Sequence, residues 1–174
     1  MKKLQVIALA FVAFVMLFSS CKKTDESNTA LLCYKNGWVL SEATSSPAYK
    51  MSGGENCTDL LLCYLEDCEK DDVIAFTEDG GQTINPKEVC TEWGIQSQKA
   101  CTWKFNEDET VLYCQLPFFY NDNEDSYNEM QENCKVMSLT ADELKLSYTF
   151  EIANEETKAA EQYTFYMTYV HAKK

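Results

Sequence analysis

The chain contains no arginine, one histidine and three prolines. Without the planar fork of arginine, bidentate recognition of phosphate or carboxylate groups is excluded. Fifteen lysines stand against 28 acidic residues, which gives a net charge of −13. Such a surface argues against nucleic acid as a partner, because its phosphates require basic patches. We expect an acidic surface suited to solubility and no nucleic-acid binding.

The sequence also lacks the residue patterns of catalysis. A serine or cysteine nucleophile needs a neighbouring base, and the one imidazole, His171, lies three residues from the end of the chain. Carboxylates are plentiful, but nothing singles out a glycosidase-type pair among them. We expect no enzyme activity, no catalytic residue, no cofactor and no metal. The segment Asn121 to Glu132 offers calcium binding as an alternative, but Ser126 stands where an EF-hand loop needs glycine, which favours a solvated acidic loop.

What the N-terminus does contain is an export signal. Met1-Lys2-Lys3 is basic, residues 6–18 are apolar, and small residues precede Cys21. The apolar run is shorter than the roughly 20 residues of a spanning helix. The residues before Cys21 resemble the lipobox of Bacteroidetes lipoproteins, which implies that Cys21 carries diacylglycerol and a further acyl chain. We expect an outer-membrane lipoprotein anchored through these lipids, at either the cell surface or the periplasmic face.

This anchor sets the domain boundaries. Residues 1–20 are expected to be the signal peptide, residues 21–35 the lipidated N-terminus with a flexible tether, and residues 36–174 one domain. Loss of residues 1–20 removes two lysines, which leaves 13 lysines, 28 acidic residues and a net charge of −15.

The cysteines predict a disulfide framework. Nine are present, and lipidation of Cys21 leaves an even number in an exported chain. The alternative is a zinc site at Cys57, Cys63 and Cys68, but their spacing is too wide for a CxxC clip.

One pairing follows from strand register. Residues 101–105 and 110–116 flank a polar turn, and a symmetric hairpin places Phe105 opposite Thr110 and Trp103 opposite Leu112. Cys101 then lies opposite Cys114 on the same apolar face. We predict a disulfide between these two cysteines.

Alternating apolar residues predict an all-β fold. We expect strands near residues 38–43, 72–77, 82–90, 101–105, 110–116, 134–139, 144–152 and 160–171, a loop over 44–56, a short helix near 57–67 and an acidic loop over 117–132. About eight strands in sequential order predict an up-and-down antiparallel barrel.

Several short motifs in this order are similar to the lipocalin-like domain of Bacteroidetes lipoproteins. They are Trp38-Val39-Leu40, the run from Cys68 to Phe76, Asp79-Gly80, Cys90, Thr102-Trp103-Lys104-Phe105, Leu112, and Ser138-Leu139-Thr140 with Leu144-Lys145-Leu146. The resemblance spans about residues 36–171 and implies a small barrel, a Cys68–Cys90 bridge and no catalytic residue. It leaves the pairing of Cys33, Cys57, Cys63 and Cys134 open.

Barrels of this size are either filled by side chains or hold one small ligand. The residues expected to face inward are Trp38, Phe76, Trp103, Phe105, Tyr148, Phe150, Phe165 and Met167. The sequence therefore supports two hypotheses: a lipoprotein that binds a small apolar molecule or a nutrient or host component, and a lipoprotein with a filled barrel that contacts another envelope protein.

Overall fold

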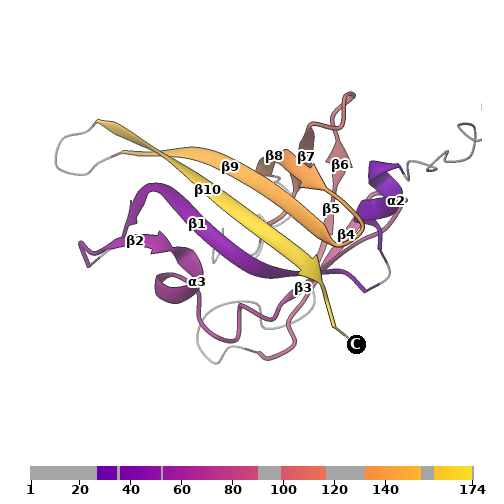
Figure 1. Ribbon diagram of the computed structural model, residues 1–174, viewed down its shortest axis with the longest axis horizontal. Helices are drawn as coiled ribbons and strands as arrows, with labels where there is room; N and C mark the ends of the chain where they lie inside the picture. The colour runs from indigo at the N-terminus through magenta and orange to yellow at the C-terminus, as the bar shows by residue number, and fades with distance from the viewer. Residues whose placement is uncertain are drawn as a thin grey trace, which may run out of the picture.

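Ten strands and two short helices make up the described part of the chain, which in this computed structural model comprises residues 27–34, 36–51, 53–89, 99–116, 132–153 and 159–173 (Figure 1). The helices are α2 (Asn28–Leu32) and α3 (Leu60–Cys63). The strands are β1 (Trp38–Lys50), β2 (Asn56–Asp59), β3 (Val73–Phe76), β4 (Gly81–Asn85), β5 (Lys99–Thr102), β6 (Lys104–Phe105), β7 (Val111–Cys114), β8 (Glu132–Leu139), β9 (Glu143–Ala153) and β10 (Ala160–His171).

The strands form one antiparallel sheet in the order β5-β4-β3-β1-β10-β9-β8-β7-β6, with β2 paired to β1 outside this path. Its two ends, β5 and β6, are consecutive pieces of one bent strand on either side of Trp103. The first piece pairs with β4 and the second with β7, so the bend brings the two ends of the sheet together. With β5 and β6 taken as one strand and β2 set aside, the described residues contain eight strands. The predicted all-β, up-and-down barrel of about eight strands is confirmed.

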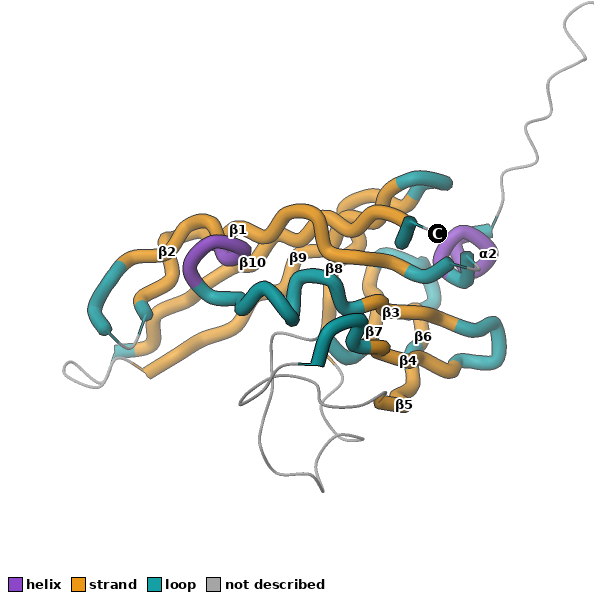
Figure 2. Tube along the Cα trace, turned by 90° about the horizontal axis from the view of Figure 1, so that it is seen from below, coloured by secondary structure: helices purple, strands orange, loops and turns teal. Residues whose placement is uncertain are grey.

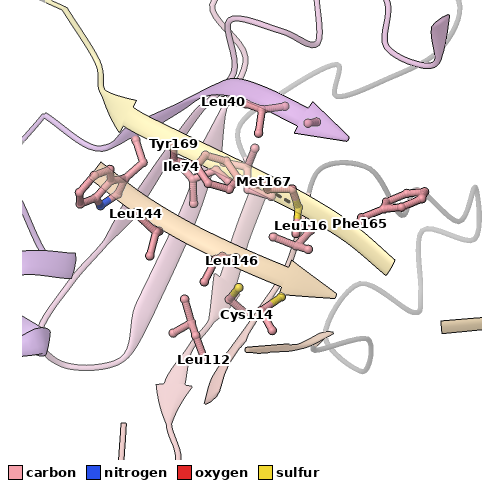
Figure 3. Close-up of a cluster of buried hydrophobic side chains, with 14 of the residues drawn as sticks. Leu40, Ile74, Leu112, Cys114, Leu116, Leu144, Leu146, Phe165, Met167 and Tyr169 are labelled. Carbon is pink, nitrogen blue, oxygen red and sulfur yellow. Dashed lines mark hydrogen bonds between the residues drawn. The ribbon is translucent and has the colours of Figure 1, made fainter. Parts of the chain in front are cut away.

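The interior is formed by alternate residues of the strands, as the period of two requires. On β10 these are Tyr163, Phe165, Met167 and Tyr169, each at most 3% exposed. Opposite them on β9 the register sets Leu144 against Tyr169 and Leu146 against Met167. Burial of each such side chain contributes about 1.5–3 kcal/mol, so this pair of strands forms a large part of the core (Figure 3).

The first strand is longer than predicted. β1 continues to Lys50 through residues expected to form a loop, and its pairing with β10 extends to Ser46 opposite Thr164. Serine and threonine made this segment resemble a loop, but a long partner strand supplies its backbone hydrogen bonds. The predicted loop over 44–56 is therefore wrong in its first half.

The predicted helix near 57–67 is present but shorter. Only Leu60–Cys63 are helical, and Asp59 caps the helix by accepting a hydrogen bond from the Leu61 amide at 3.1 Å. Residues 56–59 form β2 instead, because they pair with the far end of β1. Within the described ranges, no helix has the length and apolar character required to cross a membrane.

One end of the barrel is closed by α2, which lies beside the C-terminal end of β10 (Figures 1 and 2). Leu32 of this helix is fully buried, and its carbonyl accepts a hydrogen bond from Trp38 Nε1 at 2.8 Å. The His171 ring stacks on Tyr34 with centroids 3.9 Å apart. Residues 28–32, expected to be part of the flexible tether, are therefore packed against the barrel.

Candidate ligand-binding end of the barrel

The structure buries most of the residues expected to face inward. Trp38, Phe76, Trp103, Phe165 and Met167 are each at most 7% exposed. The remaining three, Phe105, Tyr148 and Phe150, are only partly buried and pack against the same core. These eight side chains do not surround one central space, because the aromatic rings form two groups at opposite ends and Met167 lies between them.

The first group lies toward the end covered by α2. The Trp103 ring makes edge contacts with Phe76 at 5.8 Å and with Phe105 at 5.5 Å between centroids. Its indole nitrogen donates to the Thr77 carbonyl at 2.9 Å, which satisfies its polar atom.

The middle of the barrel is filled by aliphatic and sulfur-containing side chains (Figure 3). The fully buried members include Leu112, Leu116, Leu144, Leu146 and Met167. The Tyr169 hydroxyl lies among them and donates to Met167 Sδ at 3.8 Å. Side chains therefore occupy the middle of the barrel.

The opposite end of the barrel carries the second group, which we call the aromatic end: Tyr49, Tyr64, Tyr148, Phe150, Tyr163 and Phe165. Tyr49 is its centre and makes edge contacts with Tyr64, Tyr163 and Phe165 at 5.7, 5.3 and 5.6 Å. Phe150 lies edge-on to Phe165 at 4.8 Å and stacks on Tyr148 at 5.5 Å.

Sequence analysis missed two members of this group. Tyr49 lay in the predicted loop, and Tyr64 lay in the predicted helix. The signal for Tyr49 was weak, because β1 has serines and a proline where its apolar alternation would continue. Tyr163 lies in the predicted last strand, on the same face as Phe165 and Met167, and is 3% exposed.

One acid lies next to these rings. Glu132 is only 8% exposed, and it accepts a hydrogen bond from the Tyr148 hydroxyl. Burial raises the pKa of Glu132, and burial together with this acceptor raises the pKa of Tyr148. The aromatic end therefore combines apolar ring faces with one polar pair, which is the usual composition of a small-molecule site.

A covalently closed segment covers part of the aromatic end. Cys57 and Cys63 form a disulfide, and between them Leu60 is fully buried. In the same segment Leu62 is 80% exposed. The bridge rules out the alternative in which Cys57, Cys63 and Cys68 bind zinc. Within the described residues no group of three candidate ligands is placed to hold a metal ion.

Only one cysteine of the expected Cys68–Cys90 bridge lies within the described residues. Cys68 is disulfide-bonded, but Cys90 lies outside the described residues. Cys21, which we expect to carry lipid, and residues 121–131 of the alternative calcium loop also lie outside them.

The predicted hairpin register is wrong by two residues. Phe105 lies opposite Leu112 rather than Thr110, and Lys104 lies opposite Tyr113. Asn106 causes the shift, because its side chain accepts from the Val111 amide at 2.8 Å and moves the turn one residue along. Cys114 is a thiol in contact with Cys134, which differs from the Cys101–Cys114 bridge that we expected.

A hollow lies at the end of the barrel covered by α2. It is an open pocket of about 370 Å³ between α2, the β3–β4 turn and the β6–β7 turn. Trp103 and Phe105 line it together with Glu78, Asp79, Glu107 and Glu109. Trp103 and Phe105 were among the residues predicted to line a cavity. The acidic residues were not predicted, because they come from two turns with no sequence signal for proximity.

Comparisons with family models and with curated proteins found no match. The similarity to lipocalin-like lipoproteins therefore stays a prediction from the motifs, while the barrel itself is a property of the structure.

Proposed function

We propose that this protein is a membrane-anchored lipoprotein whose barrel binds a small apolar molecule at the aromatic end. The observation that carries the proposal is the contrast within the barrel. Its middle is filled, whereas the rings of Tyr148 and Phe150 face inward at the aromatic end and keep part of their surface uncovered.

Exposed apolar side chains on α3, just after it and on β9 support the same function. Leu62 is 80% exposed, and Tyr64 and Ile152 are 37% and 38% exposed. Large exposed apolar side chains are available for contact with an apolar ligand. The Tyr148–Glu132 pair offers a polar group to one end of such a molecule.

The anchor is proposed from the sequence. Lipidation of Cys21 after removal of residues 1–20 would hold the barrel at the outer membrane, on the surface or the periplasmic side. Each buried methylene of the acyl chains contributes about 0.8 kcal/mol, which makes attachment by two or three chains long-lived. We propose no catalytic role and no nucleic-acid partner.

Two measurements test the binding function. Native mass spectrometry of the protein purified from its own membrane is expected to show a retained small molecule. Titration with the neutral fluorescent probe N-phenyl-1-naphthylamine is expected to give saturable binding, and Phe150→Ala is expected to weaken it at least fivefold. Tyr166→Ala, on an outward-facing residue that is 44% exposed, is the matched control. Equal binding by both variants, or no saturable binding, contradicts the proposal.

The filled middle of the barrel favours a second candidate, a lipoprotein that contacts another envelope protein. The 80% exposed Leu62 is then the contact. Chemical crosslinking in cells distinguishes the two, because only this function predicts a crosslinked partner that Leu62→Ser loses.

A further inference from the structure

Two thiols lie side by side in the wall of the barrel. Cys114 is the last residue of β7, and Cys134 is the third residue of β8. They are 1% and 0% exposed, and their side chains are hydrogen-bonded to each other. Neither takes part in the proposed ligand site.

Strand register places both sulfur atoms on the inward face. Leu112 is opposite Cys134, and Cys114 is opposite Glu132, so the two cysteines are diagonal neighbours on adjacent strands. Diagonal neighbours have Cα atoms about 7–8 Å apart, and a disulfide requires less than about 7 Å. A small shift is therefore needed to form a bond, and the end of a four-residue strand is where the backbone gives way most easily.

Cys101 is the competing partner. It lies on β5 opposite Gln82, across the seam from Cys114. The hydrogen bond with Cys134 raises the pKa of the Cys114 thiol most, and Cys101 raises it least. The seam is already joined by two hydrogen bonds between Gln82 and Gln115, at 2.6 and 2.9 Å. Proximity thus favours Cys134 over Cys101.

We propose that Cys114 and Cys134 form a disulfide that ties β7 to β8 when the chain folds in the presence of a disulfide oxidant. The Cys114 thiolate attacks one sulfur of the oxidant and releases one thiol. The Cys134 thiolate then attacks Cys114 Sγ in this mixed disulfide, and the second thiol leaves. The two cysteines lose two protons and two electrons, which convert the oxidant into two thiols.

The bond forms while the barrel is assembling rather than after it has closed. The contact with Cys134, followed by burial, raises the pKa of the Cys114 thiol well above its ordinary value. A buried thiol with little thiolate reacts slowly, so the folded protein with both thiols reduced resists oxidation.

The sequence offers a direct test by trypsin, which here cleaves only after lysine because the chain has no arginine. Cys114 and Cys134 share the peptide 105–135, whereas Cys101 lies in peptide 100–104. The full-length protein is unfolded with reductant, refolded with reduced and oxidised glutathione, alkylated and digested without reduction. We expect peptide 105–135 to be two hydrogens lighter than its reduced form and to carry no alkyl group.

Three outcomes overturn the proposal. They are a covalent link between peptides 100–104 and 105–135, a link from Cys134 to any other peptide, and alkylation of both thiols. The matched control is Cys101→Ser, in which the bond within peptide 105–135 is expected to form to the same extent. In Cys134→Ser the light form of this peptide is expected to disappear, and its persistence contradicts the assignment.

Discussion

Replacement of Asp72 by asparagine is expected to stabilise the protein above neutral pH. Asp72 lies just before β3 and is 5% exposed, and its Oδ1 has no hydrogen-bond partner. Burial, followed by the charges of Asp71 and Glu69, raises its pKa from 3.8 to about 7. Asparagine has nearly the shape of the protonated acid and never acquires its charge.

The sign of the pH dependence follows from this raised pKa. Between about pH 4 and pH 7 the folded protein keeps the Asp72 proton, whereas the unfolded chain has lost it, so rising pH favours unfolding. The stability due to this proton is complete below about pH 4 and is lost as the pH rises through about 7. A shift of about 3 units at about 1.4 kcal/mol per unit lowers the free energy of unfolding by at most about 4 kcal/mol.

Urea denaturation at pH 4.5 and pH 8 measures this effect. We expect Asp72→Asn to exceed the wild type by about 2–4 kcal/mol at pH 8 and by much less at pH 4.5. The matched control is Asp67→Asn in the same acidic segment, because the Asp67 side chain is 99% exposed and pairs only with Lys70 at the surface. The reasoning is refuted if the free energy of unfolding of Asp72→Asn falls from pH 4.5 to pH 8 by as much as that of the wild type.

Two further substitutions test the barrel. Gly37 has a φ of 68°, and a Cβ there would lie 2.8 Å from the Ile74 carbonyl oxygen, so Gly37→Ala is expected to cost at least about 2 kcal/mol in thermal denaturation. Gly53→Ala, where a Cβ meets nothing within 4 Å, is the control, and an equal loss in both would contradict the steric argument. Gln82→Leu removes both hydrogen bonds between the Gln82 side chain and the Gln115 backbone, which is expected to cost about 1–3 kcal/mol in urea denaturation. Gln82→Glu keeps only the acceptor, so its stability should lie between those of the wild type and Gln82→Leu. If Gln82→Leu is as stable as the wild type, the seam does not depend on this pair of hydrogen bonds.

The fold was predictable where one face of a strand is consistently apolar. The alternation from Leu144 to Phe150 and from Tyr163 to Tyr169 fixed both the strands and their inward faces, because the side-chain period leaves no other choice. The pairing of β3 with β4, of β6 with β7 and of β8 with β9 followed from the short turns between them, since sequential strands joined by short turns usually pair.

The candidate site was less predictable, because it depends on contacts between distant parts of the chain. Tyr49 reaches the aromatic end only because β1 continues along β10, and nothing in the local sequence shows this extension. The hairpin register depended on the Asn106 side chain, which shifted every pair by two while keeping the faces correct. Proximity of Cys114 to Cys134 likewise follows from the pairing of β7 with β8 across a long insertion.

The bent strand that joins the two ends of the sheet has a consequence for behaviour at high concentration. An open sheet presents a row of unpaired amides and carbonyls, which recruits strands from other molecules. Here β5 pairs with β4 along one side, and β6 pairs with β7 along one side. The unpaired backbone groups at the seam are therefore limited to the other sides of these strands, which are four and two residues long. Such short edges are poor templates for pairing between molecules, so many copies can come close together without aggregating through this seam.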